Sequence, residues 1–259
     1  SLALRRCPAL LIVPPDFARY KQASLATQAI YHRYSELIEP LSLDEAYLDV
    51  TDPKIPSPSA TATAQAIRAQ IREATQLTAS AGVAPNKFIA KIASDWNKPD
   101  GLYVVKPSQI EAFLLPLKVG LIPGVGKVME KKLAELGVAT VGDLRGLSRE
   151  TLEGRFGTFG TRLHQRALGI DDRPVEPDQP VQSISSEDTF ESDLPLEALA
   201  PMIERLAEKT WAATRKTARV GRTVVLKLKT SQFRILTRSF TPDAPPASQA
   251  ELTRIALAL

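Results

Sequence analysis

Cysteine and histidine are scarce in this sequence, with Cys7, His32 and His164 as the only examples among 259 residues. A single cysteine cannot form an internal disulfide, and so few sulfur and imidazole ligands argue against a zinc site. Apolar runs are also short, and none reaches the roughly 18 residues that a membrane-spanning helix requires. The first residues lack the order and the cleavage site of a signal peptide. We therefore expect a protein of the reducing cytoplasm that has no membrane partner.

Acidic residues are absent from one long stretch near the C-terminal end. Residues 209–238, KTWAATRKTARVGRTVVLKLKTSQFRILTR, contain nine lysines and arginines and no aspartate or glutamate. A solvated helix face normally carries charges of both signs, whereas a one-sided block creates a positive field that suits a polyanion. This stretch therefore favours nucleic acid as a partner.

Changes in the hydrophobic pattern predict an α+β multidomain protein with three units. Residues 1–106 alternate helical and strand patterns, residues 107–173 read as short helices broken by glycines, and residues 183–259 return to strands and helices. Three prolines in residues 174–182, PVEPDQPVQ, are typical of a linker. In residues 1–106 the expected elements are, in chain order, a buried strand ending at Pro14 and Pro15, a helix in 17–39, a strand in 41–51, a helix at 60–75, a strand in 76–85, a basic helix at 86–96 and a strand at 102–105. In residues 183–259 they are a strand near 183, a helix at about 195–218, two strands and a helix from about 247.

The segment LSLDEAYLDVT, residues 41–51, places two adjacent acids within a strand pattern. The apolar alternation changes phase at Asp44 and Glu45, which predicts a strand break or a β-bulge there. Unpaired carboxylates are costly to bury, so these side chains either point at water or bind a metal ion. Since the chain lacks clustered cysteine and histidine ligands, Mg²⁺ or Mn²⁺ suits such hard oxygen donors. The pair by itself does not decide between the two readings.

Two glycine-containing turns lie between helical patterns in residues 107–173. In LIPGVGKVMEKKLAELGV, Gly124 and Gly126 precede a helix that begins near Lys127, and in a weaker copy Gly157 and Gly160 open another helix. A tight hairpin leaves free amides at a helix N-terminus, where a phosphate can bind. The glycines could instead only cap sharp turns. Two turns in tandem, each followed by cations, favour helix-hairpin-helix motifs that contact a DNA backbone without reading its sequence.

Three stretches that occur in this order, SLDEAYLDVT, SAGVAPNKFIAKIASDWNKPDG and IPGVGK, resemble the Y-family translesion DNA polymerases, most closely the bacterial DNA polymerase IV branch. The resemblance covers essentially the whole chain. It implies that residues 1–106 form a partial palm with a mixed α/β sheet, residues 107–173 an all-α helix-hairpin-helix thumb, and residues 183–259 an α+β little finger. The implied activity is template-directed addition of deoxynucleotides to a primer 3′ end.

The resemblance also implies roles for individual residues. Asp44 would bind both of two catalytic Mg²⁺ ions, for which Mn²⁺ can substitute, and Glu45 the ion that activates the primer 3′-hydroxyl. Lys98, in NKPDG, matches the family lysine that contacts the incoming triphosphate, whereas Lys87 and Lys91 are assigned no catalytic role. The implied partners are primer–template DNA, deoxynucleoside triphosphates and, in the complete protein, a sliding clamp. The protein is expected to be a monomer.

The implied little finger also carries an alternating basic strand. Lys227 and Lys229 alternate with leucines, which predicts a sheet with one face on its own helices and a basic face that fits a DNA backbone. The residues expected to join this basic face are Arg222, Arg234 and Arg238.

Some features of the family have no recognisable counterpart in the sequence. These are the first strand with its further metal-binding aspartate, the steric-gate aromatic, the fingers and the last strand of the little finger. If the molecule begins at Ser1, we expect it to bind primer–template DNA and to polymerise poorly or not at all. Two other readings are a non-catalytic helix-hairpin-helix DNA-binding module and a palm-fold nucleotide cyclase. A degenerate module tends to lose the acidic pair, which this chain keeps, and a cyclase has no use for hairpins or a basic sheet.

Overall fold

The computed structural model describes residues 2–217 and 219–259 and divides the chain into two compact units. Unit 1 comprises Ser1–Asp178 and unit 2 comprises Gln179–Leu259. The boundary between them falls within residues 174–182, the range in which the prolines predict a linker. Among the described residues, no helix combines the length and the apolar character needed to cross a membrane.

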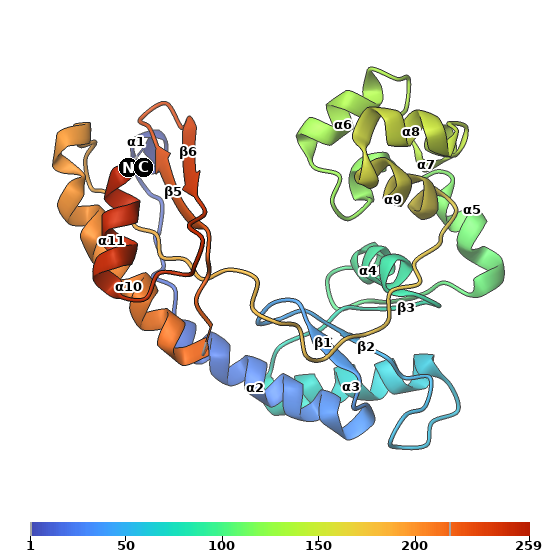
Figure 1. Cartoon of the computed structure of the whole chain (residues 1–259). Helices are drawn as coiled ribbons and strands as arrows, with labels where there is room; N and C mark the ends of the chain where they lie inside the picture. Colours follow the sequence, from blue (N-terminus) through green and yellow to red (C-terminus); the bar gives the residue numbers. More distant parts are fainter. Residues whose placement is uncertain (1, 218) are drawn as a thin grey trace. The chain divides into compact units, whose positions relative to one another are not determined.

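Unit 1 contains short strands and mostly short helices (Figure 1). Its helices are α1 (Leu2–Arg6), α2 (Phe17–Tyr34), α3 (Ala60–Thr75), α4 (Lys87–Trp96), α5 (Ile110–Leu114), α6 (Lys127–Ala134), α7 (Val141–Arg145), α8 (Arg149–Phe156) and α9 (Thr158–Ala167), with 3₁₀ turns at Pro107–Gln109 and Val119–Leu121. Its strands are β1 (Ile38–Pro40), β2 (Ala46–Leu48), β3 (Ala81–Val83) and β4 (Leu102–Val104). The predicted helices at 60–75 and 86–96 are therefore confirmed, as are the short strands in 76–85 and 102–105.

The prediction of a buried strand before Pro14 is wrong. Residues 2–6 form α1, and residues 7–16 form neither a helix nor a strand. Leu11 and Val13 are 88% and 84% exposed. A strand needs a neighbouring strand that takes its backbone hydrogen bonds, and no strand in the described part of the chain pairs with this segment.

Helices α2 and α3 lie side by side in unit 1 (Figure 1). Asp16 caps α2 and Ser59 caps α3, because each side-chain oxygen accepts a backbone amide of the first turn. Helix α2 ends at Tyr34, earlier than expected, since the chain turns there into β1. The residues buried between the two helices are Ile30, Tyr34, Ile67 and Ile71.

The expected mixed sheet is divided into two separate two-stranded ladders. Strands β1 and β2 pair in antiparallel fashion, with Ile38 opposite Leu48, and β3 and β4 pair in parallel, with Ala81 opposite Leu102. Residues 41–45 connect β1 to β2 and belong to neither strand. The strand predicted across these residues is therefore broken at its two acids, as the change of phase indicated.

Helix α4 connects the strands to helices α5–α9. It can lie close to β3 because Gly82 has no side chain: a Cβ there would lie 2.0 Å from the carbonyl oxygen of Ala90. Phe88 and Ile89 of α4 belong to the same buried core as the apolar residues of α5–α9. The residues on the two sides of the boundary expected after residue 106 thus share one continuous hydrophobic core.

The described residues of unit 2 form two α-helices and a two-stranded antiparallel sheet (Figure 1). Its elements are a 3₁₀ turn at Leu196–Ala198, α10 (Ala200–Thr217), β5 (Val224–Lys229), β6 (Ile235–Phe240) and α11 (Gln249–Ala258). Helix α11 packs on β5 and α10 packs along α11. The order of helix, two strands and helix is confirmed, but the residues near 183 form no strand, because no described strand lies beside them. Ala218, the expected end of the long helix, lies outside the described residues.

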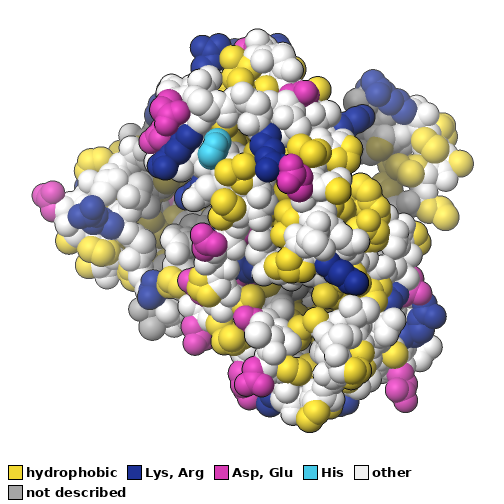
Figure 2. Space-filling view, turned by 90° about the vertical axis from the view of Figure 1, so that its right-hand side faces the viewer, with side chains coloured by type: hydrophobic (Ala, Val, Ile, Leu, Met, Phe, Trp, Pro, Cys, Tyr) yellow, Lys and Arg dark blue, Asp and Glu magenta, His cyan; other side chains and the backbone are white. Residues whose placement is uncertain are grey.

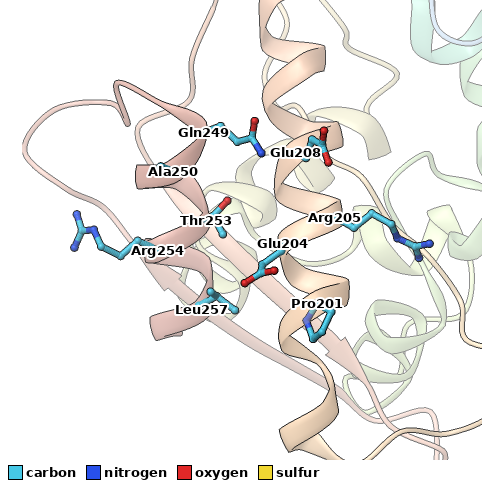
Figure 3. A pocket seen from close by; sticks show the side chains of 9 residues that line it. All are labelled: Pro201, Glu204, Arg205, Glu208, Gln249, Ala250, Thr253, Arg254 and Leu257. Atoms are coloured by element: carbon cyan, nitrogen blue, oxygen red, sulfur yellow. The ribbon is translucent and has the colours of Figure 1, made fainter.

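A shallow groove lies between α10 and α11 (Figure 3). Glu204 and Glu208 line it from α10, facing neutral residues of α11. Arg205 and Arg254 lie at its edges, and Figure 3 shows both guanidinium groups pointing away from it. The interior of the groove is therefore acidic and does not suit a polyanion.

Candidate functional site

The acidic turn, residues 41–45, is organised around the hydroxyl of Ser42. This hydroxyl donates to Asp44 Oδ1 at 2.6 Å, and its oxygen accepts the backbone amides of Asp44 at 3.3 Å and Glu45 at 3.2 Å. The amide of Leu41 donates to the carbonyl of Glu45 at 2.9 Å, which closes the turn. Both acids are exposed. The backbone of the turn is therefore well defined while the two carboxylates remain accessible.

Lys91 of α4 contacts this turn, and Lys98, just beyond the end of α4, contacts Asp95. Lys91 Nζ is 2.9 Å from Glu45 Oε2, and Lys98 Nζ is 2.5 Å from Asp95 Oδ1. The hydrogen bond to Asp95 raises the pKa of Lys98, and the negative charges of the acidic turn raise it further. Lys98 thus lies within the electrostatic influence of the two acids, while its ion-pair partner is Asp95. Sequence reasoning missed the contact of Lys91 with Glu45. The one feature of the sequence that could have indicated it is the spacing of four residues between Lys87 and Lys91, which places both lysines on one face of a helix.

The chemistry of the acidic turn fits a hard divalent cation. Carboxylate oxygens are the ligands that Mg²⁺ prefers, and Mg²⁺ is often held by one or two carboxylates together with water and phosphate oxygens. Glu45 uses only Oε2 in its ion pair. Among the described residues, no three histidine, cysteine, aspartate or glutamate side chains gather into a group that could hold a metal ion. Asp44 and Glu45 therefore fit as part of a ligand set.

A buried ion pair fixes the start of α4 against β1. Lys87 Nζ lies 2.6 Å from Glu39 Oε2, and the side chains are 7% and 9% exposed. The same oxygen of Glu39 accepts the amide of Glu176 at 2.9 Å. Burial alone would raise the pKa of Glu39, but Lys87 and this amide outweigh it and lower the pKa. Since Lys87 precedes Lys91 by one helical turn, the pair places Lys91 beside the acidic turn.

A second buried carboxylate ties α4 to the end of α9. Asp171, whose side chain is 2% exposed, lies 2.6 Å from Arg166 Nη1 and 2.7 Å from Arg173 Nε. Its Oδ2 also accepts the amide of Phe88 at 3.1 Å. Burial alone would raise the pKa of Asp171, but the two arginines hold it well below its ordinary value. No sequence pattern marked this cluster, because its members meet only in the folded chain.

The first hairpin, which is the turn at Gly124 and Gly126 before α6, has the geometry of an anion site. Gly124 adopts a φ of 94°, a left-handed conformation that favours glycine, and Gly126 caps α6. None of the described residues accepts a hydrogen bond from the first-turn amides of Lys127, Val128 and Met129. The side chain of Lys127 is 95% exposed, although its Nζ lies 3.0 Å from Glu130 Oε2. Three free amides and an exposed cation at a helix N-terminus suit a phosphate.

The second hairpin differs from the expectation at one glycine. Gly157 has a φ of 60° and caps α9, as a helix-opening glycine should. Gly160 lies inside α9, where its amide donates to the carbonyl of Gly157 at 2.9 Å. A Cβ at Gly160 would lie 1.9 Å from the carbonyl oxygen of Leu152. Gly160 therefore permits the close packing of α8 and α9 and has no free amide for a phosphate.

Figure 2 shows the face of the molecule that lies on the right of Figure 1. On this face lysines and arginines are interspersed with aspartates, glutamates and apolar side chains (Figure 2). They do not form one continuous basic patch there. An anion on this face would depend on local groups such as free amides rather than on a broad positive field.

The sheet of unit 2 separates the expected basic residues between its two faces. Lys227 and Lys229 alternate with half-buried leucines and are exposed, as predicted. The register pairs Arg238 with Leu226, and directly paired residues share a face. Arg238 therefore lies on the face opposite to Lys227, because side chains alternate along a strand. The expectation that Arg238 joins the basic face is wrong, whereas Arg222 and Arg234 are exposed beyond the strand ends.

Three family models match the chain. The model described as the impB/mucB/samB family matches residues 1–95, and the one described as its C-terminal domain matches residues 181–259. A model described as DNA polymerase-iota, thumb domain, matches residues 120–171. These matches include the acidic turn, both hairpins and the sheet of unit 2.

Curated relatives are similar to the chain over almost its whole length. A DNA polymerase IV of Xanthomonas axonopodis pv. citri is 67% identical over 257 residues, which are 99% of this chain and 72% of that protein. A DNA polymerase IV of Neisseria meningitidis is 49% identical over 255 residues, or 96% of this chain and 72% of that protein.

Solved structures have a similar fold. A Y-family DNA polymerase chimera superposes with a TM-score of 0.86 at 26% identity and covers 100% of this chain and 74% of that one. An insertion ternary complex of Dbh DNA polymerase superposes with a TM-score of 0.64 at 25% identity and covers 100% and 74%.

Proposed function

Since the chain belongs to the Y family of translesion DNA polymerases, we propose that the acidic turn is the catalytic centre of a template-directed, lesion-bypassing DNA polymerase. The reaction adds a deoxynucleotide to a primer 3′ end. In this proposal Asp44 and Glu45 hold two Mg²⁺ ions, or Mn²⁺ in their place, and Lys98 contacts the incoming triphosphate. Residues 1–106, 107–173 and 183–259 then correspond to palm, thumb and little finger.

The observation that carries this proposal is a turn with two exposed carboxylates, contacted by Lys91 at 2.9 Å, whose negative charge also acts on Lys98. The carboxylates lie in a turn whose backbone is fixed by Ser42, and the pKa of Lys98 is raised by Asp95 and then by the charges of that turn. Nucleotidyl transfer needs oxygen ligands for divalent cations and a cation for the phosphates within one small volume. The acidic turn and Lys98 supply both.

Divalent cations held by Asp44 and Glu45 would make the primer hydroxyl a better nucleophile and neutralise charge on the leaving oxygen. The residues of the chain perform the remaining tasks. Ser42 holds the turn in one conformation. Lys98 would exchange its contact with Asp95 for the phosphate oxygens and offset their charge.

In this proposal the chain contacts the DNA backbone through amides and cations, which do not read the base sequence. The first hairpin, in which Gly124 and Gly126 form the turn and Lys127 begins the helix with a free amide, and the turn at Gly157 suit phosphates. In unit 2 the exposed side chains of Lys227 and Lys229 add a positive surface, joined by Arg222 and Arg234. The partners are primer–template DNA and deoxynucleoside triphosphates, in keeping with the similarity to an insertion ternary complex of a DNA polymerase. In the complete protein a sliding clamp joins them.

Primer extension by the complete native protein tests this proposal. We expect Asp44→Asn to slow extension by about a hundredfold to a thousandfold, because loss of one metal ligand removes several kcal/mol of transition-state stabilisation. Binding of primer–template DNA should be retained. Asp52→Asn is the matched control, since Asp52 is an exposed acid outside the turn.

Two outcomes would contradict the proposal. If Asp44→Asn extends primers as fast as the Asp52→Asn control, the catalytic assignment fails and the non-catalytic DNA-binding module becomes the better reading. If Asp44→Asn loses DNA binding and activity to the same degree, Asp44 is a structural residue of the turn instead.

A further inference from the structure

The side chain of Glu45 has only one ion-pair partner among the described residues. Its backbone is held by Ser42, but its carboxylate extends from an exposed turn and meets Lys91 Nζ at 2.9 Å. The side chain is 47% exposed. An exposed glutamate without a partner samples several rotamers, and fixing it in one costs conformational entropy. The orientation of this carboxylate therefore depends on Lys91.

Lys91 is presented to Glu45 from a rigid element. Helix α4 is buried through Phe88, Ile89 and Ile92, and its first turn is held by the Lys87–Glu39 ion pair. The Lys91 side chain is 32% exposed, so it is partly withdrawn from water. A cation on a fixed helix restricts the partner carboxylate more than a cation on a loop does.

The contact leaves one oxygen of Glu45 available. Lys91 occupies Oε2 alone, and the other oxygen makes no hydrogen bond or ion pair to a described residue. In metal sites, a hydrogen-bond partner on one side of a ligand commonly fixes the direction of its free side. This arrangement differs from a surface ion pair such as Lys54–Glu36, where both side chains lie in water and neither belongs to the site.

We propose that Lys91 is a positioning residue that holds Glu45 in the orientation required to bind a divalent cation. The proposal rests on the function proposed above and adds to it a residue that does not itself touch the metal or the nucleotide. Lys91 has two opposite effects on a divalent cation. The positive charge of Lys91 opposes cation binding nearby, whereas the ion pair that orients Glu45 favours cation binding. The second effect dominates.

The test measures Mn²⁺ binding as well as activity. The complete native protein, bound to primer–template DNA and a non-hydrolysable nucleotide, is titrated with Mn²⁺ and followed by electron paramagnetic resonance. We expect Lys91→Met to weaken Mn²⁺ binding and to lower kcat, each by about tenfold to a hundredfold, with little change in KM for the nucleotide. Lys91→Arg, which can still hold the carboxylate, should restore most of both quantities.

Lys54→Met provides the matched control, because it removes a lysine from an exposed pair outside the site. Unchanged or tighter Mn²⁺ binding by Lys91→Met overturns the proposal, since the lysine would then act only as a competing charge. A fall in Tm well beyond that of the control also overturns it, because Lys91 would be a structural residue. If Asp44→Asn is active, the proposed function itself has failed; if only Lys91→Met is unaffected, the inference alone has failed.

Discussion

Replacing Asp171 by asparagine should destabilise unit 1 far more than a typical surface substitution does. Asparagine keeps the shape and can still accept the amide of Phe88, but it removes the charge that faces Arg166 and Arg173. The Arg166 side chain is 15% exposed, so it would remain as a poorly compensated buried charge. Breaking a buried ion pair in this way costs about 3–5 kcal/mol. At about 2–4 °C per kcal/mol, the lower figure corresponds to a Tm decrease of about 6–12 °C.

Thermal unfolding followed by circular dichroism checks this magnitude. Asp172→Asn is the control, because the neighbouring aspartate is exposed and makes no hydrogen bond or ion pair to a described residue; its effect should stay within about 0.5 kcal/mol. Asp171→Ala should be worse than Asp171→Asn, since it also leaves the Phe88 amide without its acceptor. Equal Tm values for Asp171→Asn and Asp172→Asn would show that the buried ion pair of Asp171 does not stabilise unit 1.

The same variant should show a distinctive pH dependence. The arginines hold the pKa of Asp171 well below its ordinary value despite burial. A carboxyl with a lowered folded pKa contributes stability that is complete above its unfolded pKa, near 3.9, and is lost as the pH falls toward the folded value. The Tm difference between the wild type and Asp171→Asn should therefore be largest near neutral pH and shrink below about pH 4. A constant difference would contradict the ion-pair explanation.

Two further predictions concern DNA binding and helix packing. Lys227→Ala and Lys229→Ala should each weaken DNA binding on all sequences and reduce the slope of log affinity against log salt by about 1; Arg238→Ala, on the opposite face, should change the slope less, and equal slopes would contradict the assignment of faces. Gly160→Ala should destabilise unit 1 by about 3 kcal/mol or more, because its Cβ meets a carbonyl of α8. Gly154→Ala has open space at the Cβ and should stabilise α8 by about 0.5–1 kcal/mol; similar Tm values for both glycine variants would refute the packing argument.

Helix α4 links the candidate site to the rest of unit 1. Its first turn contacts β1 through Lys87 and Glu39 and the end of α9 through Asp171, and residues beyond its end include Lys98. Its middle carries Lys91 toward the acidic turn. A shift of this helix would therefore move both cations relative to the carboxylates. Its two buried anchors oppose such a shift.

Much of the local structure could be predicted because it depends on nearby residues. The helical spacing of apolar residues in 60–75 and the capping Ser59 define α3. The change of phase at Asp44 and Glu45 correctly indicated a break in the strand, because alternation reports which face each side chain occupies. The strand predicted before Pro14 is wrong because an apolar run favours a strand but does not supply the neighbouring strand with which it must pair.

Sequence patterns alone reveal the residue types of the candidate site, the positions of its turns and the one-sided charge of residues 209–238. These are properties of short segments, and local sterics and periodicity are sufficient to reveal them. The folded chain is needed to show which face Arg238 occupies, that Gly160 serves packing, and that Lys91 and Asp171 contact groups distant in the chain. Strand register, helix–helix distance and ion pairing depend on atoms brought together by folding. No local pattern along the chain encodes those distances.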